Sequence, residues 1–181
     1  MWEYTKKIEV IDDFRVYPYT CFSNFSNHIV ILPMSLFDNR EITFKTGEHA
    51  FQAFKCDNRA DAEWVISAPT PADAKRRASR NGVDGRKITL RAGWDSISKD
   101  VMNAVVYAKT LLHFTIREVL VNTGNDIIIE GNTWGDKLWG MVKNKDGVWE
   151  GENRLGQAWM NARWRIAWEE YTKVIPYYNR G

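Results

Sequence analysis

The chain has 181 residues, of which 44% are hydrophobic and 27% charged, and this balance is ordinary for a globular domain with its own core. No apolar run approaches the ~20 residues that span a bilayer, the polar start of the chain is unlike a signal peptide, and a net charge of only +2 argues against a general polyanion binder. We therefore expect one cytoplasmic domain over residues 1–181. Cys21 and Cys56 have no secretory context, so we expect both thiols to be reduced and partly buried.

Strands and short helices are predicted in the first half of the chain. Runs of β-branched and aromatic residues predict strands at 14–22, 29–32 and 41–46, with the loop 23–27 joining the first two. Helical spacing then predicts helices at 47–55, 60–67 and 71–80. Pro71 suits the first turn of the third helix, and Asn81-Gly82 closes it.

The second half is dominated by one long periodic segment. Apolar residues keep helical spacing from Ser98 to Val121, with Lys109 within that face, and 123–125 is a plausible stop. Short strands are predicted at 127–130 and 139–142, and a final helix begins near Asn153. The sum is a mainly helical α+β domain with small antiparallel sheet elements.

A polar stripe runs along the helix predicted at 47–55. Glu48, Gln52 and Lys55 are spaced i, i+4, i+7 and share one side, opposite the small apolar residues Ala50 and Ala53. Such a stripe is usually a solvated face that contributes little to stability. Here it directly follows a predicted strand, and strand-to-helix junctions commonly build pockets. The spacing leaves both readings equal.

A basic segment follows this stripe. It holds seven cations and a single acid, Asp84, and such a block can bind phosphates through charge and forked guanidinium contacts. A solvated helix face with a basic loop is an equal alternative for most of these side chains, so we expect one or two of them at a phosphate. The cations are Lys75, Arg76, Arg77, Arg80, Arg86, Lys87 and Arg91.

Four carboxylates stand in aromatic or glycine-rich surroundings. Glu48 opens a helix, and Asp95 follows Trp94, where capping of the long helix is the favoured reading. Asp136 is either a turn residue or part of a ligand site, and its flanking tryptophans favour the ligand site. Glu130 ends a predicted strand and has pairing with a surface lysine as its alternative. No paired-cysteine motif or second histidine follows the zinc patterns, so no metal site is predicted.

The ordered series of motifs resembles the NADAR family (YbiA-like proteins) from about residue 22 to 163. Its most specific piece is Gly47-Glu48-His49-Ala50-Phe51-Gln52-Ala53-Phe54-Lys55. The other matching pieces are Phe22-Ser23-Asn24-Phe25-Ser26, Pro71, Ala74-Lys75, Trp94-Asp95, Lys99, Met102, Thr123-Gly124, Glu130, Asp136, Trp139-Gly140, Asn153, Leu155-Gly156, Met160 and Arg163.

The resemblance implies an enzyme that hydrolyses the N-glycosidic bond between a ribosyl group and a base, without a metal or cofactor. Breaking this bond builds positive charge on the ribose and negative charge on the departing base. Glu48 is the first catalytic candidate, to stabilise the cation or activate water, and Asp136 or Lys55 would protonate the base.

The resemblance also implies a substrate-binding set. Phe25, Trp94 or Trp139 would stack on the base, and Lys75 would hold a phosphate. Residues of the matched motifs complete the set: Ser23, Asn24, Ser26, Gln52, Gly140 and Asn153. The chain departs from its relatives at Ala78-Ser79, where they show Gly-Arg, and at 109–112, so phosphate placement and substrate choice are the points in doubt.

Two substrate classes and one non-enzymatic function go with this resemblance. ADP-ribose on guanine in DNA or RNA is the leading hypothesis, because the basic segment suits both a pyrophosphate and a nucleic-acid strand. The alternative substrates are phosphoribosylated intermediates of riboflavin synthesis. The alternative of another class is a non-catalytic ADP-ribose or nucleotide-binding module.

Overall fold

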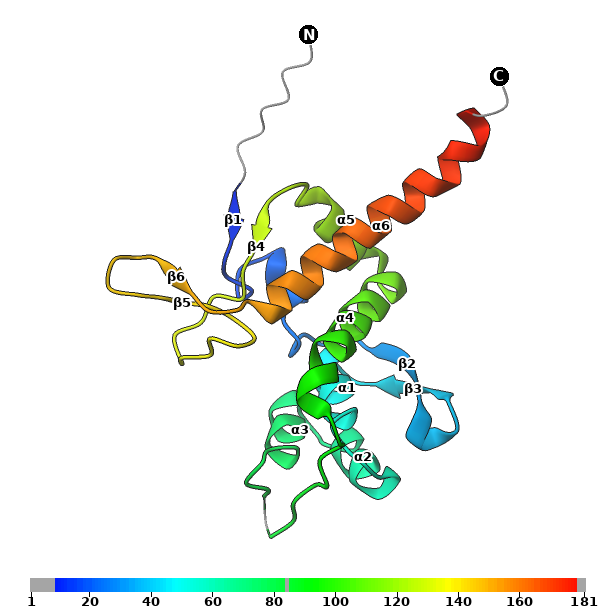
Figure 1. Ribbon diagram of the computed structural model, residues 1–181, viewed down its shortest axis with the longest axis vertical. Coiled ribbons are helices and arrows are strands. Elements are labelled where there is room, and N and C mark those ends of the chain that lie inside the picture. Colours follow the sequence, from blue (N-terminus) through cyan, green and yellow to red (C-terminus); the bar gives the residue numbers. More distant parts are fainter. Residues whose placement is uncertain (1–8, 84, 179–181) are drawn as a thin grey trace.

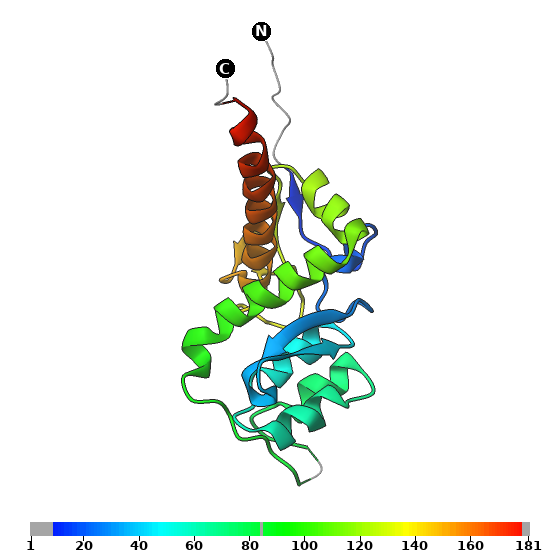
Figure 2. The ribbon, with the colours of Figure 1, turned by 90° about the vertical axis from the view of Figure 1, so that its right-hand side faces the viewer.

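Two long helices, α4 (Trp94–Leu112) and α6 (Arg154–Tyr178), pack against each other at the centre of the molecule. In the computed structural model, which describes residues 9–83 and 85–178, the other elements gather on two sides of α4 (Figures 1 and 2). Six helices and small two-stranded sheets make up this part of the chain, so the mainly helical α+β prediction is confirmed. None of the described helices is long and apolar enough to cross a bilayer.

The antiparallel pair β2 (Val30–Met34) and β3 (Arg40–Phe44), linked through η2 (Ser35–Phe37), leads into three short helices. These are α1 (Gly47–Ala53), α2 (Arg59–Ile66) and α3 (Pro71–Arg77). Each begins at a polar cap, Thr46, Asn58 or Thr70, whose side chain accepts a hydrogen bond from the backbone N–H three residues on. The caps satisfy donors that the first helical turn leaves free, so short helices can begin at fixed residues.

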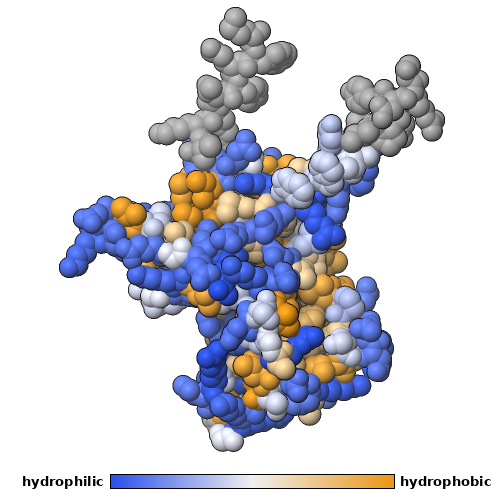
Figure 3. All heavy atoms as spheres, viewed as in Figure 1, coloured by the Kyte–Doolittle hydropathy of each residue, from blue (hydrophilic) through white to orange (hydrophobic). Residues whose placement is uncertain are grey.

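The other end of the molecule carries the remaining strands. β1 (Val10–Ile11) pairs in parallel with β4 (Ile127–Ile128), and β5 (Val142–Lys143) pairs antiparallel with β6 (Trp149–Glu150). The β5–β6 hairpin projects from the body at the left of Figure 1, and hydrophilic residues cover much of it in Figure 3. The 3-10 helix η1 (Tyr19–Phe22) and α5 (Phe114–Asn122) complete this half.

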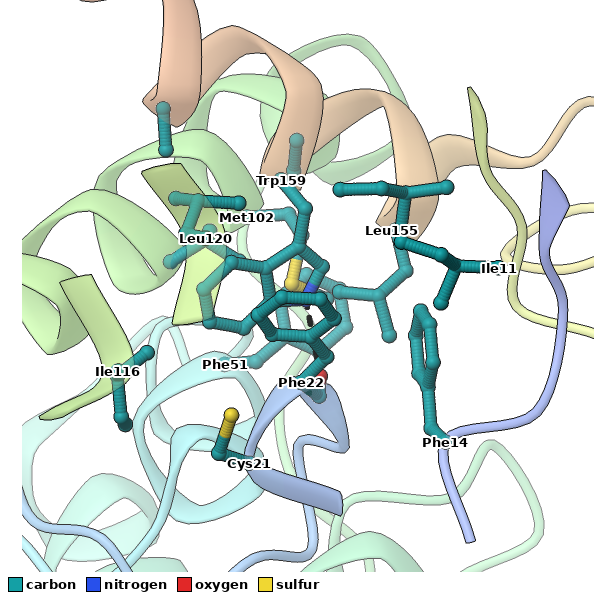
Figure 4. Packing of buried hydrophobic residues seen from close by; sticks show 14 of the residues in the cluster. Ile11, Phe14, Cys21, Phe22, Phe51, Met102, Ile116, Leu120, Leu155 and Trp159 are labelled. Carbon is teal, nitrogen blue, oxygen red and sulfur yellow. Dashed lines mark hydrogen bonds between the residues drawn. The ribbon is translucent and has the colours of Figure 1, made fainter. Parts of the chain in front are cut away.

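The buried apolar residues form two clusters, separated by α1 and α4. The first surrounds Trp159 and Phe22, whose ring centroids lie 4.6 Å apart, and the Trp159 indole N–H donates to the Phe22 carbonyl at 2.9 Å (Figure 4). The second lies under β2 and β3 and includes Ala50 and Ala53, whereas Phe51 of the same helix belongs to the first. Because both sides of α1 face a cluster, this helix is buried along its whole length.

Two elements differ from the sequence prediction. The strand predicted at 14–22 is wrong: turns and η1 occupy this segment, because Pro18 lacks a backbone donor and the Asp13 carboxylate accepts from the Arg15 backbone N–H, which favours a turn. The single helix predicted at 98–121 begins earlier, at Trp94, and breaks at His113, whose backbone is extended. The His113 ring forms a hydrogen bond with the Ile29 carbonyl at 2.8 Å, which favours this break.

The other sequence-predicted elements agree in type, with shifted ends. Asp95 does not cap α4; Gly93, with φ of 69°, is the N-cap, and Asp95 lies in the first turn. The strand predicted at 139–142 forms only at Val142–Lys143, which leaves Trp139 and Gly140 in a loop. Cys21 and Cys56 are free and buried, as expected, and Cys56 lies in the second cluster.

Truncation of the first cluster should cost much stability. We expect Trp159→Ala to lower the free energy of unfolding by about 3–5 kcal/mol, because it opens a cavity and leaves the Phe22 carbonyl unpaired. Urea unfolding followed by circular dichroism measures this loss. The matched control is Trp164→Ala on the same helix, whose side chain is 67% exposed and whose loss should stay within about 0.5 kcal/mol. Equal losses in the two variants would contradict this account of the core.

Candidate active site

A cavity of about 960 Å³ opens between α1, the end of α3, the start of α4 and the loop that follows β4. Its volume lies at the upper end of the range that small-molecule ligands occupy. Ten of the residues predicted for the site line it, although they come from five separate segments. These are Ser23, Asn24, Phe25, Glu48, Gln52, Lys55, Lys75, Trp94, Asp136 and Trp139.

The polar stripe of α1 forms one wall of this cavity. Glu48 and Gln52 are only 6% and 4% exposed, so the reading as a solvated face is wrong for both. The Gln52 amide donates to Glu48 Oε1 at 2.8 Å and orients the carboxylate. Lys55 follows the end of the helix, and its ammonium still lies along the cavity, where it donates to the Ala78 carbonyl at 3.3 Å.

Burial and nearby charges shift the protonation of this wall in opposite directions. Loss of water raises the pKa of Glu48, whereas the hydrogen bond from Gln52 and the cations Lys75 and Lys55 lower it. Burial lowers the pKa of Lys55, and Glu48 opposes that shift. The carboxylate and the amine are therefore electrostatic partners across a largely desolvated space.

Asp136 has both of the roles that were predicted as alternatives, a turn residue and a residue of the cavity. It lines the cavity, and its Oδ1 also accepts the backbone N–H groups of Leu138 at 3.0 Å and Trp139 at 2.9 Å, which is the behaviour of a turn residue. Asn132 fixes the same loop, because its Oδ1 accepts from the Asp136 N–H at 2.9 Å and its Nδ2 donates to the Asp136 carbonyl at 2.7 Å. Asp136 thus holds the loop in place at the cavity edge.

Glu130 also lines the cavity, and the predicted site set omitted it. Burial, followed by the charges of Asp136 and Glu48, raises the pKa of its carboxyl to about 7. The alternative of a surface lysine partner is wrong, since no ion pair to Glu130 forms among the described residues. The sequence signal was a carboxylate at the end of a buried strand, but its burial depends on distant segments.

Three buried oxygen atoms around the cavity have no hydrogen-bond partner. They are Asn24 Oδ1, Gln52 Oε1 and Glu130 Oε2, and they are the only such side-chain atoms in the described part of the chain. An unpaired buried polar atom costs about 1–3 kcal/mol, and a native fold rarely leaves several in one place. All three atoms lie around one cavity, where a ligand with polar groups could form the missing hydrogen bonds.

Aromatic rings form the floor and the rim of the cavity. Phe51 contacts Trp94 at 5.1 Å and Trp139 at 4.9 Å between ring centroids, so these tryptophans are braced by the core. Phe25 and Trp134 are 43% and 66% exposed at the rim, where a flat group could stack on them. Trp134 was not in the predicted set, although the sequence places it two residues before Asp136.

The basic segment divides into two groups. Lys75, Arg80 and Lys87 line the cavity mouth, and all three are exposed. Two of the remaining arginines make structural contacts instead. Arg77 donates to the Trp64 carbonyl at 2.6 Å and joins α3 to α2, and Arg86 pairs with Asp61 at 3.2 Å and joins the loop after α3 to α2.

Three predicted binding residues lie behind the cavity wall. The Asn153 amide accepts from the Glu130 N–H at 3.0 Å and donates to the Ile128 carbonyl at 2.8 Å. A Cβ at Gly140 would lie 2.2 Å from the Glu130 carbonyl oxygen, so only glycine fits there. Ser26 accepts a hydrogen bond from Lys109 at 2.6 Å. All three support residues that line the cavity and are not among its lining themselves.

Lys109 is a further residue that the predicted set lacked. Its ammonium is fully buried and donates to the Cys21 carbonyl at 2.6 Å, the Ser23 carbonyl at 3.0 Å and Ser26 Oγ at 2.6 Å. It thereby fixes the loop that brings Ser23, Asn24 and Phe25 to the cavity. Burial lowers the pKa of Lys109 to about 7.

The described residues contain no group of three or more His, Cys, Asp or Glu side chains arranged to hold a metal ion. The features that are present define a class: an α+β domain with a largely apolar cavity that has carboxylates and aromatic rings in its wall and cations at its mouth.

Comparison with known proteins places the chain within a family. Residues 13–167 match the model of the NADAR domain, and the chain belongs to the NADAR family. It is 34% identical over 149 residues to N-glycosidase Npun_R5314 of Nostoc punctiforme, which covers 82% of this chain and 86% of that protein. It is 33% identical over 128 residues to N-glycosidase YbiA of Escherichia coli, which covers 71% of this chain and 74% of YbiA.

The fold agrees with a solved relative. The NMR structure of E. coli YbiA superimposes with a TM-score of 0.69 at 29% sequence identity, over 90% of this chain and 88% of that one. The family and the fold class inferred from the sequence motifs are both confirmed by these comparisons.

The buried lysine gives a pH-dependent stability difference. The pKa of Lys109 is about 7 in the folded chain and near 10.5 when unfolded, so the unfolded state binds more protons between these values. In this window the free energy of unfolding of the wild type, relative to Lys109→Met, should rise by about 1 kcal/mol per pH unit. Urea unfolding of both proteins at pH 7, 8 and 9 measures the difference. The exposed Lys99→Met is the control, and a flat difference for Lys109→Met would refute the assignment.

Proposed function

We propose that this chain is an N-glycosidase that removes ADP-ribose from guanine in nucleic acid. Membership of the NADAR family and relatives named N-glycosidases support hydrolysis of an N-glycosyl bond. The observation that carries the proposal is the buried Glu48 carboxylate, oriented by Gln52 inside a cavity with a cationic mouth.

The chemistry of the reaction suits this carboxylate. As the bond between ribose C1′ and the base nitrogen lengthens, positive charge develops on the ribose. Glu48 is buried, and a fixed negative charge in a buried position stabilises a developing cation more strongly than in solvent. The same carboxylate can take a proton from the water that attacks C1′.

The cavity mouth supports a large, phosphorylated substrate. Lys75, Arg80 and Lys87 lie where they could hold a pyrophosphate, and two guanidinium or ammonium groups suit two phosphates. The volume of about 960 Å³ has room for an ADP-ribosyl group, which a smaller phosphoribosyl pyrimidine would fill only partly. Trp139 and the exposed Phe25 offer faces for the flat groups at either end of the ligand.

The substrate test uses two candidate compounds in parallel. Purified protein is incubated with an oligonucleotide that carries ADP-ribosylated guanine and, separately, with the phosphoribosylated riboflavin precursor, and mass spectrometry follows release of base or ribose. Cleavage of the oligonucleotide supports the proposal. Cleavage of the precursor alone would replace it with metabolite hydrolysis, and binding of ADP-ribose without any cleavage would favour a non-catalytic binding module.

Glu48→Gln separates catalysis from binding. The amide keeps the shape of the side chain but removes its charge, so we expect kcat to fall by about 10²–10⁴-fold while the Kd for ADP-ribose changes by only a few-fold. Turnover assays and calorimetric titration give the two values. The control, Glu63→Gln, removes a surface carboxylate that pairs with Arg59 on α2 and should leave both values unchanged. Full activity in Glu48→Gln would remove this residue from the mechanism.

A further inference from the structure

Glu48, Glu130 and Asp136 share the cavity but have different surroundings. We propose that Glu130 is the catalytic acid, whose carboxyl proton passes to the departing base. This inference rests on the proposed N-glycosidase function and adds a residue that neither the family match nor the names of relatives assign.

The backbone of Glu130 is fixed on both sides. Its N–H donates to Asn153 Oδ1 at 3.0 Å, and its carbonyl accepts from the Met141 N–H at 2.9 Å. Gly140 packs directly on that carbonyl, so a larger residue there would displace it. The side chain therefore projects into the cavity from a rigid point, which a proton donor needs in order to meet its acceptor.

The carboxyl group of Glu130 has a free end inside the cavity. Its Oε2 is buried and has no hydrogen-bond partner among the described residues. A carboxylic acid there would present an O–H with no acceptor until a ligand arrives, and a ring nitrogen or carbonyl of a base is an acceptor of this kind.

Asp136 and Lys55 are less suited to this step, although the sequence made them the candidates for it. Asp136 Oδ1 accepts two backbone N–H groups, so this oxygen is engaged in holding its loop. Lys55 interacts electrostatically with Glu48 and donates to the Ala78 carbonyl. Its ammonium is therefore engaged near Glu48, where the ribose cation would develop. Burial and the negative charges of Asp136 and Glu48 instead raise the pKa of Glu130 to about 7, so a large fraction of Glu130 carries its proton at neutral pH. The Gln52 amide donates to Glu48 Oε1, whereas Glu130 Oε2 has no partner in the described part of the chain, so hydrogen bonding distinguishes a proton acceptor from a proton donor in the cavity.

The step balances with water as the only other reactant. As the bond from C1′ to the base nitrogen breaks, its electron pair passes to the base, which takes the proton of Glu130. Water adds to C1′ and gives its proton to the Glu48 carboxylate. The products are the guanine of the nucleic acid with a new N–H and ADP-ribose with a new hydroxyl at C1′, and exchange with solvent then reprotonates Glu130 and deprotonates Glu48.

A pair of leaving groups tests the assignment. Guanine needs a proton as it leaves, whereas 4-nitrophenolate on the same ADP-ribosyl group does not. We expect Glu130→Gln to lower kcat on the guanine substrate by about 10²-fold or more and on the nitrophenyl substrate by less than about 5-fold. Glu48→Gln should lower both. The wild type should lose guanine activity as pH rises through about 7 but keep nitrophenyl activity.

Controls keep the test decisive. Asp136→Asn should slow both substrates equally, through displacement of its loop, and Glu130→Asp should keep part of the guanine activity, because it retains an acid. If Glu130→Gln slows both substrates to the same extent while its circular dichroism is unchanged, Glu130 is not the proton donor, although the N-glycosidase function stands. A wild type inactive on both substrates would overturn the proposed function and this inference together.

Discussion

The burial of α1 is the constraint on which the rest of the site depends. Alanines at 50 and 53 let one side of this short helix approach the second core cluster, and Phe51 fills the first cluster on the other side. A carboxylate enclosed in this way is costly unless something faces it. Gln52 supplies one hydrogen bond, and Lys55 and Lys75 supply distant positive charge. The only direction left open to Glu48 is the cavity, so the same packing that stabilises the helix also aims its carboxylate.

Hydrogen-bond satisfaction separates the residues that build the cavity from those available for chemistry. Asp136 Oδ1 and the side-chain polar atoms of Asn153 and Lys109 form hydrogen bonds within the chain, and each residue fixes a loop. Glu130, Gln52 and Asn24 each retain one buried oxygen without a partner. A group whose bonds are complete gains little from a ligand, whereas an unpaired buried atom gains a full hydrogen bond. Roles in the site therefore follow from this division more directly than from residue type.

Local patterns predicted most elements and part of the site. Periodicity and caps located α1, α2 and α3, and the motif around Glu48 placed the central residues in one helix. The spacing of the stripe does not reveal that it is buried, because the burial of α1 comes from α2, α3 and α4, which are separate segments of the chain. Glu130 is missing from the predicted site for a similar reason. The loop at Gly140 and Asn153 before α6 enclose it, and both lie later in the chain. The break at His113 depends on a contact with Ile29, 84 residues away, which helical spacing does not register.

One of the two departures from the family motifs, at Ala78-Ser79, falls on the cavity. Ala78 and Ser79, where the family shows Gly-Arg, lie on the wall beside the cationic mouth, and the Ala78 carbonyl accepts from Lys55. Arg80, one place later, reaches Asp95 at 3.5 Å across that mouth. Glu48, Gln52 and Glu130 lie on other segments and keep their geometry through α1 and β4. Because residues 78–80 and the carboxylates lie on different segments, substitutions at 78–80 would alter the cationic mouth of the cavity and leave the geometry of Glu48 and Glu130 in place.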